Sequence, residues 1–342
     1  MRKIFLIPLL LSSFLFGKSE FIKICENPTV EQKELLQRMM RASIYLDYEA
    51  YLCEKVEKKL NSQEKNVPKR IIVNRVLDNE YKLNNIYLIE YFTEVEELNI
   101  QNNNIKDISP LKNLKNLKKL DITYNPIDNI DVLSNLTNLE ELSLDQNSLK
   151  DLKLLENLKN LQYLLLASGN DIKEKIDISA ISKLSNLKDL SIFRLDIEDI
   201  CVLNNLTQLE KLIVNGYKIT DISCLDKLTN LKSLRLSFNS IENIDVLKNY
   251  KELKYLEIID TQIKNLDALK DLENLHTVYV KRNSKLEDTS AISYKDLGNY
   301  EAYDNPKLNW CSPKTYEDMI NHKSCYEKDG TLKAFWKRWL GI

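Results

Sequence analysis

The sequence is dominated by an apolar motif that recurs every 22 residues. Residues 117–125 read LKKLDITYN, and residues 139–147 and 231–239 also fit the pattern LxxLxLxxN. Successive copies are 22 residues apart, except for one spacing of 26. A single short unit cannot bury its apolar face alone, so this pattern requires units that stack on one another. The first apolar position of the motif recurs at Val95, Leu117, Leu139, Leu161, Leu187, Leu209, Leu231, Leu253, Leu275 and Leu297.

The two halves of each unit predict different local structures. Alternation in LxL is typical of a short strand whose leucines point into a shared interior. The following Asn marks a turn, and its side-chain amide can bond the backbone of neighbouring coils to form a ladder. The second half reads IxxLxxL, as at residues 108–114, 130–136 and 222–228. So short a unit leaves room only for 3₁₀ or short helical turns on the return path, which predicts an α/β repeat solenoid.

These motifs resemble the leucine-rich repeat family, and in particular its 22-residue bacterial subtype, the internalin-like proteins. The resemblance covers about residues 80–310. It implies a leucine-rich repeat horseshoe with parallel strands on the concave face, a helical N-terminal cap and a small C-terminal cap. It also implies a protein that binds another macromolecule. The sequence shows no cell-wall sorting motif, so the internalin mode of anchorage is not carried over.

The segments that flank the repeats predict a signal and two caps. Residues 1–17 have a basic start, an apolar run and a small final residue, the order of a secretory signal. An uncleaved anchor is the alternative, although the apolar run over residues 4–16 is too short to span a bilayer. Residues 18–70 predict a helical N-terminal cap, because apolar side chains recur at helical spacing. Leucine-rich repeats are expected over 71–310, as about ten full units after a degenerate first coil, and a C-terminal cap over 311–342.

The one irregular spacing, between Leu161 and Leu187, carries four extra residues. They must bulge within residues 168–176, because the flanking leucines still have to stack. We expect a local protrusion or a change of curvature there, not a domain boundary.

Cysteine usage predicts disulfides. Six cysteines in a chain with an export signal favour disulfides over a metal site. Cys201 and Cys224 fall on neighbouring coils, where either a disulfide or two buried free thiols would fit. The other four lie in the predicted caps, where we expect local bonds between Cys25 and Cys53 and between Cys311 and Cys325.

Composition argues against several classes of function. A formal charge of −2 is unsuited to nucleic-acid binding, and no GxGxxG or GxxxxGK motif is present for phosphate. His276 and His322 are far apart and lie in no HExxH motif, so we expect no metal and no cofactor. Stacked repeats bring carboxylates together for structural reasons, which makes such pairs poor evidence of acid–base catalysis. The sequence therefore predicts a protein that is not an enzyme.

Candidate binding residues lie between and just after the strand leucines, on the predicted concave face. Early coils carry polar residues there, such as Glu97, Asn99 and Gln101. Clustered apolar surface usually marks an interaction site, and Tyr and Arg often anchor interfaces. The alternatives are that scattered apolar residues are normal on any surface, or that the C-terminal segment folds back over them. The candidates are Tyr163, Leu165, Phe193, Arg194, Ile213, Arg235, Phe238, Tyr255, Ile259 and Tyr279, and the same coils lose the turn Asn at Gly169, Leu195, Tyr217 and Thr261.

Together these features predict an exported protein, secreted or periplasmic, that recognises a protein partner through its concave face and is a monomer. One alternative is an envelope-associated scaffold. The basic aromatic segment 332–340 would hold it weakly at a membrane surface, unless those aromatics cover the last coil. The other alternative is an inhibitor of a secreted enzyme.

Overall fold

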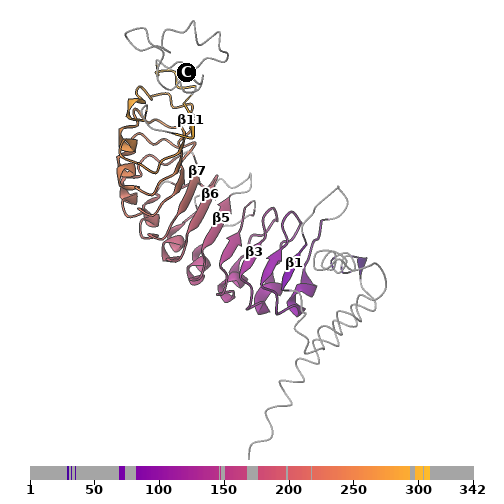
Figure 1. The fold of residues 1–342 in the computed structure, drawn as a ribbon. Helices are drawn as coiled ribbons and strands as arrows, with labels where there is room; N and C mark the ends of the chain where they lie inside the picture. The colour runs from indigo at the N-terminus through magenta and orange to yellow at the C-terminus, as the bar shows by residue number, and fades with distance from the viewer. Residues whose placement is uncertain are drawn as a thin grey trace, which may run out of the picture. The chain divides into compact units, whose positions relative to one another are not determined.

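The computed structural model describes residues 29, 30, 32, 35, 69–73, 82–145, 147, 151–167, 176–197, 199–216, 218–292, 297–302 and 304–308. The chain forms two compact units, Met1–Ile172 (unit 1) and Lys173–Ile342 (unit 2). In each unit the strands lie side by side on one side of the coils, and the 3₁₀ turns lie on the other (Figure 1). The strands on one side and the 3₁₀ turns on the other agree with the repeat solenoid predicted from the motif.

Unit 1 contributes one strand from each described coil. Neighbouring strands pair in parallel, and Leu98, Leu120, Leu142 and Leu164 occupy one register position. The equivalence of these leucines is what the 22-residue spacing predicts. The strands are numbered β and the 3₁₀ helices η. The elements are β1 (Arg70–Ile72), η1 (Tyr87–Tyr91), β2 (Glu97–Asn99), η2 (Ser109–Asn113), β3 (Lys119–Asp121), η3 (Asp131–Asn135), β4 (Glu141–Ser143), η4 (Lys153–Asn157) and β5 (Tyr163–Ala167).

Unit 2 repeats the same arrangement, with parallel pairing from β6 to β11 in chain order. The return segments are 3₁₀ helices, as predicted, and several are only three residues long. The elements are η5 (Ser179–Lys183), β6 (Asp189–Phe193), η6 (Cys201–Leu203), β7 (Lys211–Asn215), η7 (Ser223–Leu225), β8 (Ser233–Arg235), η8 (Asp245–Asn249), β9 (Tyr255–Glu257), η9 (Asp267–Leu269), β10 (Thr277–Tyr279), η10 (Ser290–Ile292) and β11 (Asn299–Glu301).

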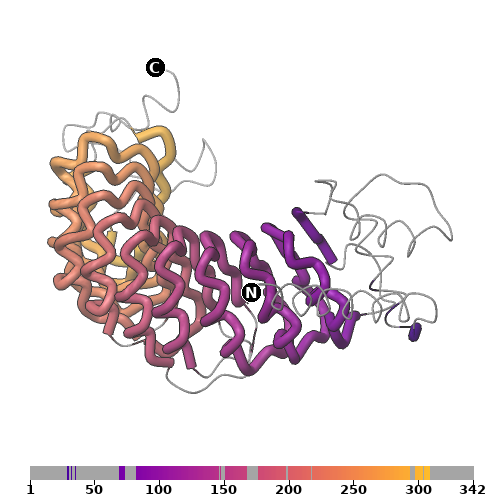
Figure 2. Tube along the Cα trace, turned by 90° about the horizontal axis from the view of Figure 1, so that it is seen from below, coloured from indigo at the N-terminus to yellow at the C-terminus, as the bar shows by residue number. Residues whose placement is uncertain are grey.

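The core of each unit lies between its strands and its 3₁₀ helices. Leucines of the motif, such as Leu142 and Leu234, are 0–1% exposed. Figure 2 shows the coils of each unit following one another as stacked turns, so each coil closes the apolar interior of its neighbour. Tyr250 takes a leucine position in unit 2 and is buried, and its hydroxyl donates to the Leu225 carbonyl oxygen at 2.8 Å.

The predicted asparagine ladder is confirmed. The Nδ2 of Asn125 donates to the Ile100 carbonyl oxygen of the preceding coil at 3.0 Å and to the Ile122 carbonyl oxygen of its own coil at 3.1 Å. Its Oδ1 accepts from the Ile105 backbone N–H at 3.0 Å. Asn103, Asn147, Asn239, Asn283 and Asn305 make comparable bonds to the preceding coil.

Two coils of unit 2 show what happens where the turn Asn is missing. Thr261 is fully buried and keeps the ladder, because its hydroxyl and its backbone N–H both donate to Asn283 Oδ1, at 2.7 and 2.8 Å. This coil therefore stays linked to the next one although it lacks the turn Asn. Leu195 is 7% exposed, and its side chain has no amide or hydroxyl that could hydrogen-bond to a neighbouring coil. Gly169 and Tyr217 lie outside the described residues.

The turns also share a backbone feature that the sequence did not predict. In seven described coils the residue directly before the turn position has φ between 53° and 60°. This left-handed conformation is disfavoured for residues with a Cβ atom. It recurs because the chain has to turn sharply out of each strand. The residues are Asn102, Tyr124, Arg194, Phe238, Asp260, Arg282 and Asp304.

The 3₁₀ helices begin at aspartate or asparagine side chains. Asp177 Oδ1 accepts from the Ser179 backbone N–H at 2.8 Å, and Asp221 does the same for Ser223. These bonds, followed by those from the serine hydroxyls, hold the pKa of both carboxyl groups below the ordinary aspartate value. Each side chain therefore satisfies a backbone donor at the start of a return segment.

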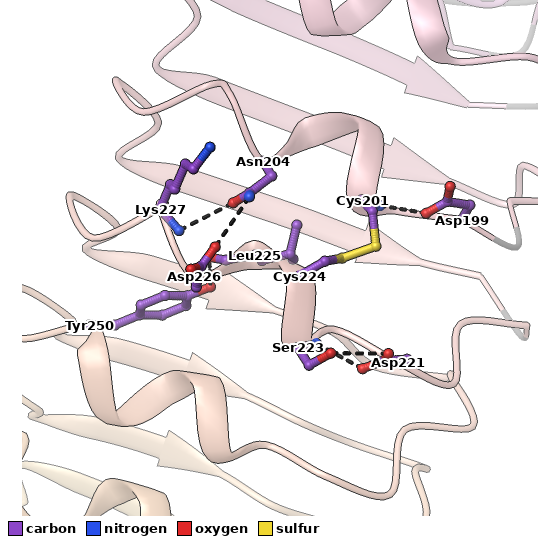
Figure 3. Close-up of a disulfide and its surroundings, with 10 residues drawn as sticks. All are labelled: Asp199, Cys201, Asn204, Asp221, Ser223, Cys224, Leu225, Asp226, Lys227 and Tyr250. Carbon is purple, nitrogen blue, oxygen red and sulfur yellow. Dashed lines mark hydrogen bonds between the residues drawn. A yellow bond between two sulfur atoms is a disulfide. The ribbon is translucent and has the colours of Figure 1, made fainter.

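A disulfide joins two neighbouring 3₁₀ helices of unit 2 (Figure 3). Cys201 in η6 and Cys224 in η7 are bonded, with their Cα atoms 5.5 Å apart. Of the two arrangements left open by the sequence, the disulfide is confirmed, and the buried free thiols are wrong because Cys201 is exposed. Beside the disulfide, Asn204 donates to Asp226 at 3.2 Å. The cap cysteines Cys25, Cys53, Cys311 and Cys325 lie outside the described residues.

The ends of the chain are only sparsely described. Thr29 and Gln32 form a reciprocal capping box, each side chain accepting from the other residue's backbone N–H, at 3.2 and 2.8 Å. The rest of the predicted N-terminal helix, residues 311–342 and the insertion at 168–175 lie outside the described residues. The boundary between the two units falls within that insertion, and the expected protrusion there stays a prediction. Within the described part of the chain, no helix has the length and apolar character needed to cross a membrane.

Candidate binding surface

Unit 2 gathers aromatic and charged side chains on the side of its strands that faces away from the leucine core. We call this side the strand face. In β8 and β9 a core leucine lies between two half-buried outward residues, and in β10 the core residue Val278 lies between buried Thr277 and half-buried Tyr279. Arg235, Glu257 and Tyr279 occupy the same register position in these three strands. The aromatic–cation cluster is defined here as Arg235, Tyr255, Glu257, Tyr279 and Lys281.

The cluster is a row of stacked cations and rings. The Arg235 Cζ lies 4.7 Å from the centroid of the Tyr255 ring. The Tyr255 and Tyr279 ring centroids are 5.7 Å apart, and the Lys281 Nζ lies 5.2 Å from the Tyr279 centroid. These separations are in the range of favourable cation–π and aromatic contacts. Each ring is therefore held in place by its neighbours in the absence of a partner.

Glu257 holds the cluster together from within. Its Oε2 accepts from the Tyr255 hydroxyl at 2.8 Å, and its Oε1 accepts from the Ser237 hydroxyl at 3.0 Å. The Arg235 Nε lies 3.8 Å from Oε2. Burial, followed by the bond to Glu257, raises the pKa of Tyr255 above the ordinary tyrosine value. Tyr255 therefore stays protonated and keeps donating its hydrogen bond at physiological pH.

A second group lies at the turns that follow the same strands. The Arg282 Cζ lies 5.4 Å from the Phe238 ring centroid, and its Nη2 lies 3.3 Å from Asp260 Oδ2. Phe238, Asp260 and Arg282 are all residues with left-handed backbone. The turn geometry therefore positions these three side chains one above another in successive coils.

The remaining candidates of unit 2 are less exposed or lie farther along the sheet. Phe193 ends β6 half-buried, and Arg194 follows it with an exposed side chain and left-handed backbone. Ile259 is half-buried after β9. Ile213 is only 6% exposed, so the expectation of an outward, accessible side chain is wrong for this residue. It lies in register between Ser191 and Arg235, whose neighbouring strands flank it.

Two candidates belong to unit 1. Tyr163 and Leu165 are half-buried in β5, and Ala167 at the end of the same strand is 5% exposed. They belong to unit 1, whereas the aromatic–cation cluster belongs to unit 2.

The strand face of unit 1 is polar and paired across neighbouring strands. Arg70 Nε lies 2.9 Å from Glu97 Oε1, and Lys119 Nζ lies 2.6 Å from Glu141 Oε1. Beside this row, Glu96 accepts from both Lys69 and Lys118. These two lysines lower the pKa of Glu96 to about 2, the bond from Lys118 being the larger cause. The polar character of the early coils was predicted, but their pairing was not.

The candidates chosen from the sequence include Arg235 but leave out four other charged residues of the unit 2 surface. Glu257, Asp260, Lys281 and Arg282 all take part. A signal for them was present in the sequence. Arg235, Glu257, Tyr279 and Glu301 follow one another at 22-residue intervals, so the opposite charges of Arg235 and Glu257 meet on adjacent strands.

A second asparagine ladder, also not predicted, lies directly before the motif leucines. There the side-chain Nδ2 donates to a backbone carbonyl oxygen of the preceding coil, at Asn116, Asn138, Asn160, Asn230 and Asn274.

Comparison with known proteins identifies the repeat. The family model described as leucine rich repeats (2 copies) matches residues 93–135 and 207–249. A solved internalin, InlF from Listeria monocytogenes, is 25% identical with a TM-score of 0.56, over 81% of this chain and 90% of that one. The chain contains leucine-rich repeats and is similar to the internalins. No curated protein sequence matches it significantly.

Other solved leucine-rich repeat proteins share the fold of this one. The Leptospira interrogans protein LIC12759 is 24% identical with a TM-score of 0.53, over 71% of this chain and 68% of that one. The Arabidopsis receptor kinase HAESA was solved with the peptide hormone IDA and the co-receptor SERK1. It is 18% identical with a TM-score of 0.53, and the match covers 70% of this chain and 43% of that one. At these identities the likeness shows the fold alone.

The described part of this leucine-rich repeat protein offers no group of three or more His, Cys, Asp or Glu side chains that could hold a metal ion. His276 is exposed at the edge of β10, as predicted, and its ring lies against Gly298, where an added Cβ would be 2.0 Å from Nε2. Leucine-rich repeat proteins are typical interaction scaffolds.

Proposed function

We propose that this chain is an exported leucine-rich repeat protein that recognises a protein partner through the strand face of unit 2. Leucine-rich repeat folds are typical of protein-binding domains. The observation that supports the proposal is the aromatic–cation cluster, in which Arg235, Tyr255 and Tyr279 stack at 4.7 and 5.7 Å. The solved complex of HAESA with a peptide hormone supports the view that such a fold accommodates a protein ligand.

The side chains of the aromatic–cation cluster are held in place before a partner binds, which favours binding. A partner that contacts flexible side chains loses affinity by restricting them, at about 0.5–1.5 kcal/mol for each immobilised side chain. Arg235 and Tyr255 are already held by each other and by Glu257. Partially buried Tyr and Arg side chains are also the types that most often dominate interface energies. The strand face of unit 2 therefore offers a partner preordered anchors.

Export is supported by the disulfide. Cys201 and Cys224 are bonded, and Cys201 is exposed to solvent. Disulfides of this kind persist in oxidising compartments and are rare in a reducing cytosol. Together with the signal predicted for residues 1–17, this supports secretion or residence in the periplasm.

A comparative capture experiment tests the proposed function. The full chain is immobilised and incubated with culture fluid and envelope extract, and captured proteins are identified by mass spectrometry. The strand-face variant carries Phe193→Ala, Arg235→Ala and Tyr255→Ala. The matched control carries Glu97→Ala, Lys119→Ala and Glu141→Ala on the strand face of unit 1.

The proposal predicts a protein that the wild type and the control capture and that the strand-face variant loses. The loss should correspond to at least about 2 kcal/mol of binding free energy, with nearly unchanged melting temperatures. Equal capture by all three proteins would place the partner elsewhere and contradict the proposed surface.

A further inference from the structure

Arg235 differs from the other cations of the two strand faces in its hydrogen bonding. Within the described part of the chain, the Arg235 side chain makes no hydrogen bond, and its Nε is buried without a hydrogen-bond partner. Its nearest carboxylate oxygen, Glu257 Oε2, is 3.8 Å away. By contrast, the nitrogens of Arg70, Lys119 and Lys211 lie 2.9, 2.6 and 2.8 Å from a carboxylate oxygen across the strands.

Arg235 lacks a close partner because Glu257 is already engaged. The Tyr255 and Ser237 hydroxyls each donate to a different oxygen of Glu257, at 2.8 and 3.0 Å. The Ser237 hydroxyl also accepts from the Ile259 backbone N–H at 3.2 Å, which fixes its orientation. Glu257 therefore balances the charge of Arg235 without satisfying its donors. A guanidinium carries five N–H donors in a rigid fork.

The guanidinium is nevertheless ordered and open to a partner. It lies over the Tyr255 ring at 4.7 Å, and 40% of the Arg235 side chain is exposed. Stacking on Tyr255 restricts the side chain before binding, so less conformational entropy is lost when the fork is filled. Arg235 is thus a preordered cation whose hydrogen-bonding capacity the protein itself does not use.

The surrounding charges select the kind of group that Arg235 would accept. Glu257 and Glu301 lie on the following strands at the same register position as Arg235. Lys281 is already paired with Glu301, and Arg282 with Asp260. A doubly charged phosphate would meet one guanidinium beside nearby carboxylates, whereas a singly charged carboxylate is repelled less by them and fits the fork of one guanidinium.

We propose that Arg235 is the anchor for a carboxylate of the partner, supplied by an Asp or Glu in a peptide segment that also places an apolar side chain on Tyr255 and Tyr279. This inference rests on the proposed function and specifies the partner's chemistry at the same surface. It makes Arg235 a specificity-determining residue, with Tyr255 as the platform that positions it.

Selection of peptides tests the inference directly. A phage-displayed library of random peptides is selected against the full chain, and the enriched peptides are synthesised for affinity measurements. The variants are Arg235→Gln and, as the matched control, Arg282→Gln, whose guanidinium also stacks on a ring but has a carboxylate at 3.3 Å. Equal melting temperatures of the three proteins confirm that each is folded.

The expected result is a shared acidic position among the peptides that compete with one another for the strand face. Their affinity should fall at least about tenfold with Arg235→Gln and less than about threefold with Arg282→Gln, because only the first removes a charge-assisted bond to the ligand. Replacing the acidic residue of the peptide by its amide should cause a similar loss with the wild type. It should cause little further loss with Arg235→Gln, which shows that the two groups interact.

This inference alone is overturned if the enriched peptides share no acidic position, or if acidic peptides bind Arg235→Gln as tightly as the wild type. Tighter binding of a phosphorylated peptide or a sulfated glycan than of the carboxylate peptide would overturn it as well. If no enriched peptide depended on Phe193, Arg235 or Tyr255, the proposed function would fail together with it.

Discussion

The strand faces of the two units are built on the same repeat and differ in what the outward side chains do. In unit 1 a charged or polar group meets its complement on the next strand, as in Arg70–Glu97 and Lys119–Glu141. In unit 2 rings and cations stack on one another, and the Arg235 side chain makes no hydrogen bond within the described part of the chain.

This difference shows that the buried leucines maintain the fold, while the outward side chains determine the surface that the fold exposes. Motif leucines such as Leu142 and Leu234 are equally buried in both units, so the interior does not distinguish them. The outward positions contribute little to the core and are free to differ. A paired polar face has few unsatisfied groups left for a partner, whereas the face of unit 2 retains apolar area and unused donors. The comparison therefore supports the proposal that the partner binds unit 2.

The largest expected effect tests the ladder that both units share. Asn125→Ala in unit 1 should lower the free energy of unfolding by about 3–5 kcal/mol, since it leaves the Ile105 N–H and buried carbonyl groups without partners. Thr261→Val in unit 2 removes one hydroxyl bond to Asn283 and should cost only about 1 kcal/mol. Denaturant unfolding followed by circular dichroism measures both. Equal losses would show that the ladder contributes alike in the two units.

The next largest expected effect is the loss of stability when the disulfide of unit 2 is removed. Replacing Cys201 and Cys224 with Ser opens a loop of 23 residues and should destabilise the surrounding coils by about 3 kcal/mol in the chain-entropy model. Hydrogen exchange should then be faster in β6 to β8 and unchanged in β2 to β4. Faster exchange in both units to the same extent would contradict a local role for the disulfide.

The smallest effect concerns the charges of unit 1. The pKa of Glu96 is about 2, below its ordinary value of 4.5, because Lys118 and Lys69 donate to the carboxylate. A depressed carboxyl pKa stabilises the folded state at neutral pH, and this contribution is lost as the pH falls from about 4.5 to about 2. NMR titration should find the Glu96 transition near the lower value. With Lys69→Gln and Lys118→Gln the transition should move upward, and an unchanged midpoint would refute the assignment.

Much of this fold is predictable from the sequence, because the leucine spacing and the turn Asn each have a single physical explanation. Leu120 and Leu142 occupy the register that the 22-residue period predicts, and Asn125 forms the predicted ladder. The left-handed backbone at Phe238 and Arg282 was not predictable, since neither residue type favours it.

The candidate surface was predictable only in part. Tyr255 and Tyr279 were found because aromatic residues are unusual on a solvent-facing strand. Glu257 was missed because its role depends on which hydroxyls reach it, and Ile213 was misjudged because alternation predicts direction but not how closely neighbouring side chains cover it. Side-chain contacts between coils lie beyond what a repeat period specifies.

The central claim is that a partner binds the strand face of unit 2 and leaves that of unit 1 open. Hydroxyl-radical footprinting of the full chain, with and without a captured partner, tests it at single side chains. The account predicts that Phe238, Tyr255 and Tyr279 become protected while Tyr124, which follows β3 in unit 1 and is 54% exposed, reacts as before. Protection confined to the tyrosines of unit 1, with Tyr255 and Tyr279 unchanged, would contradict it.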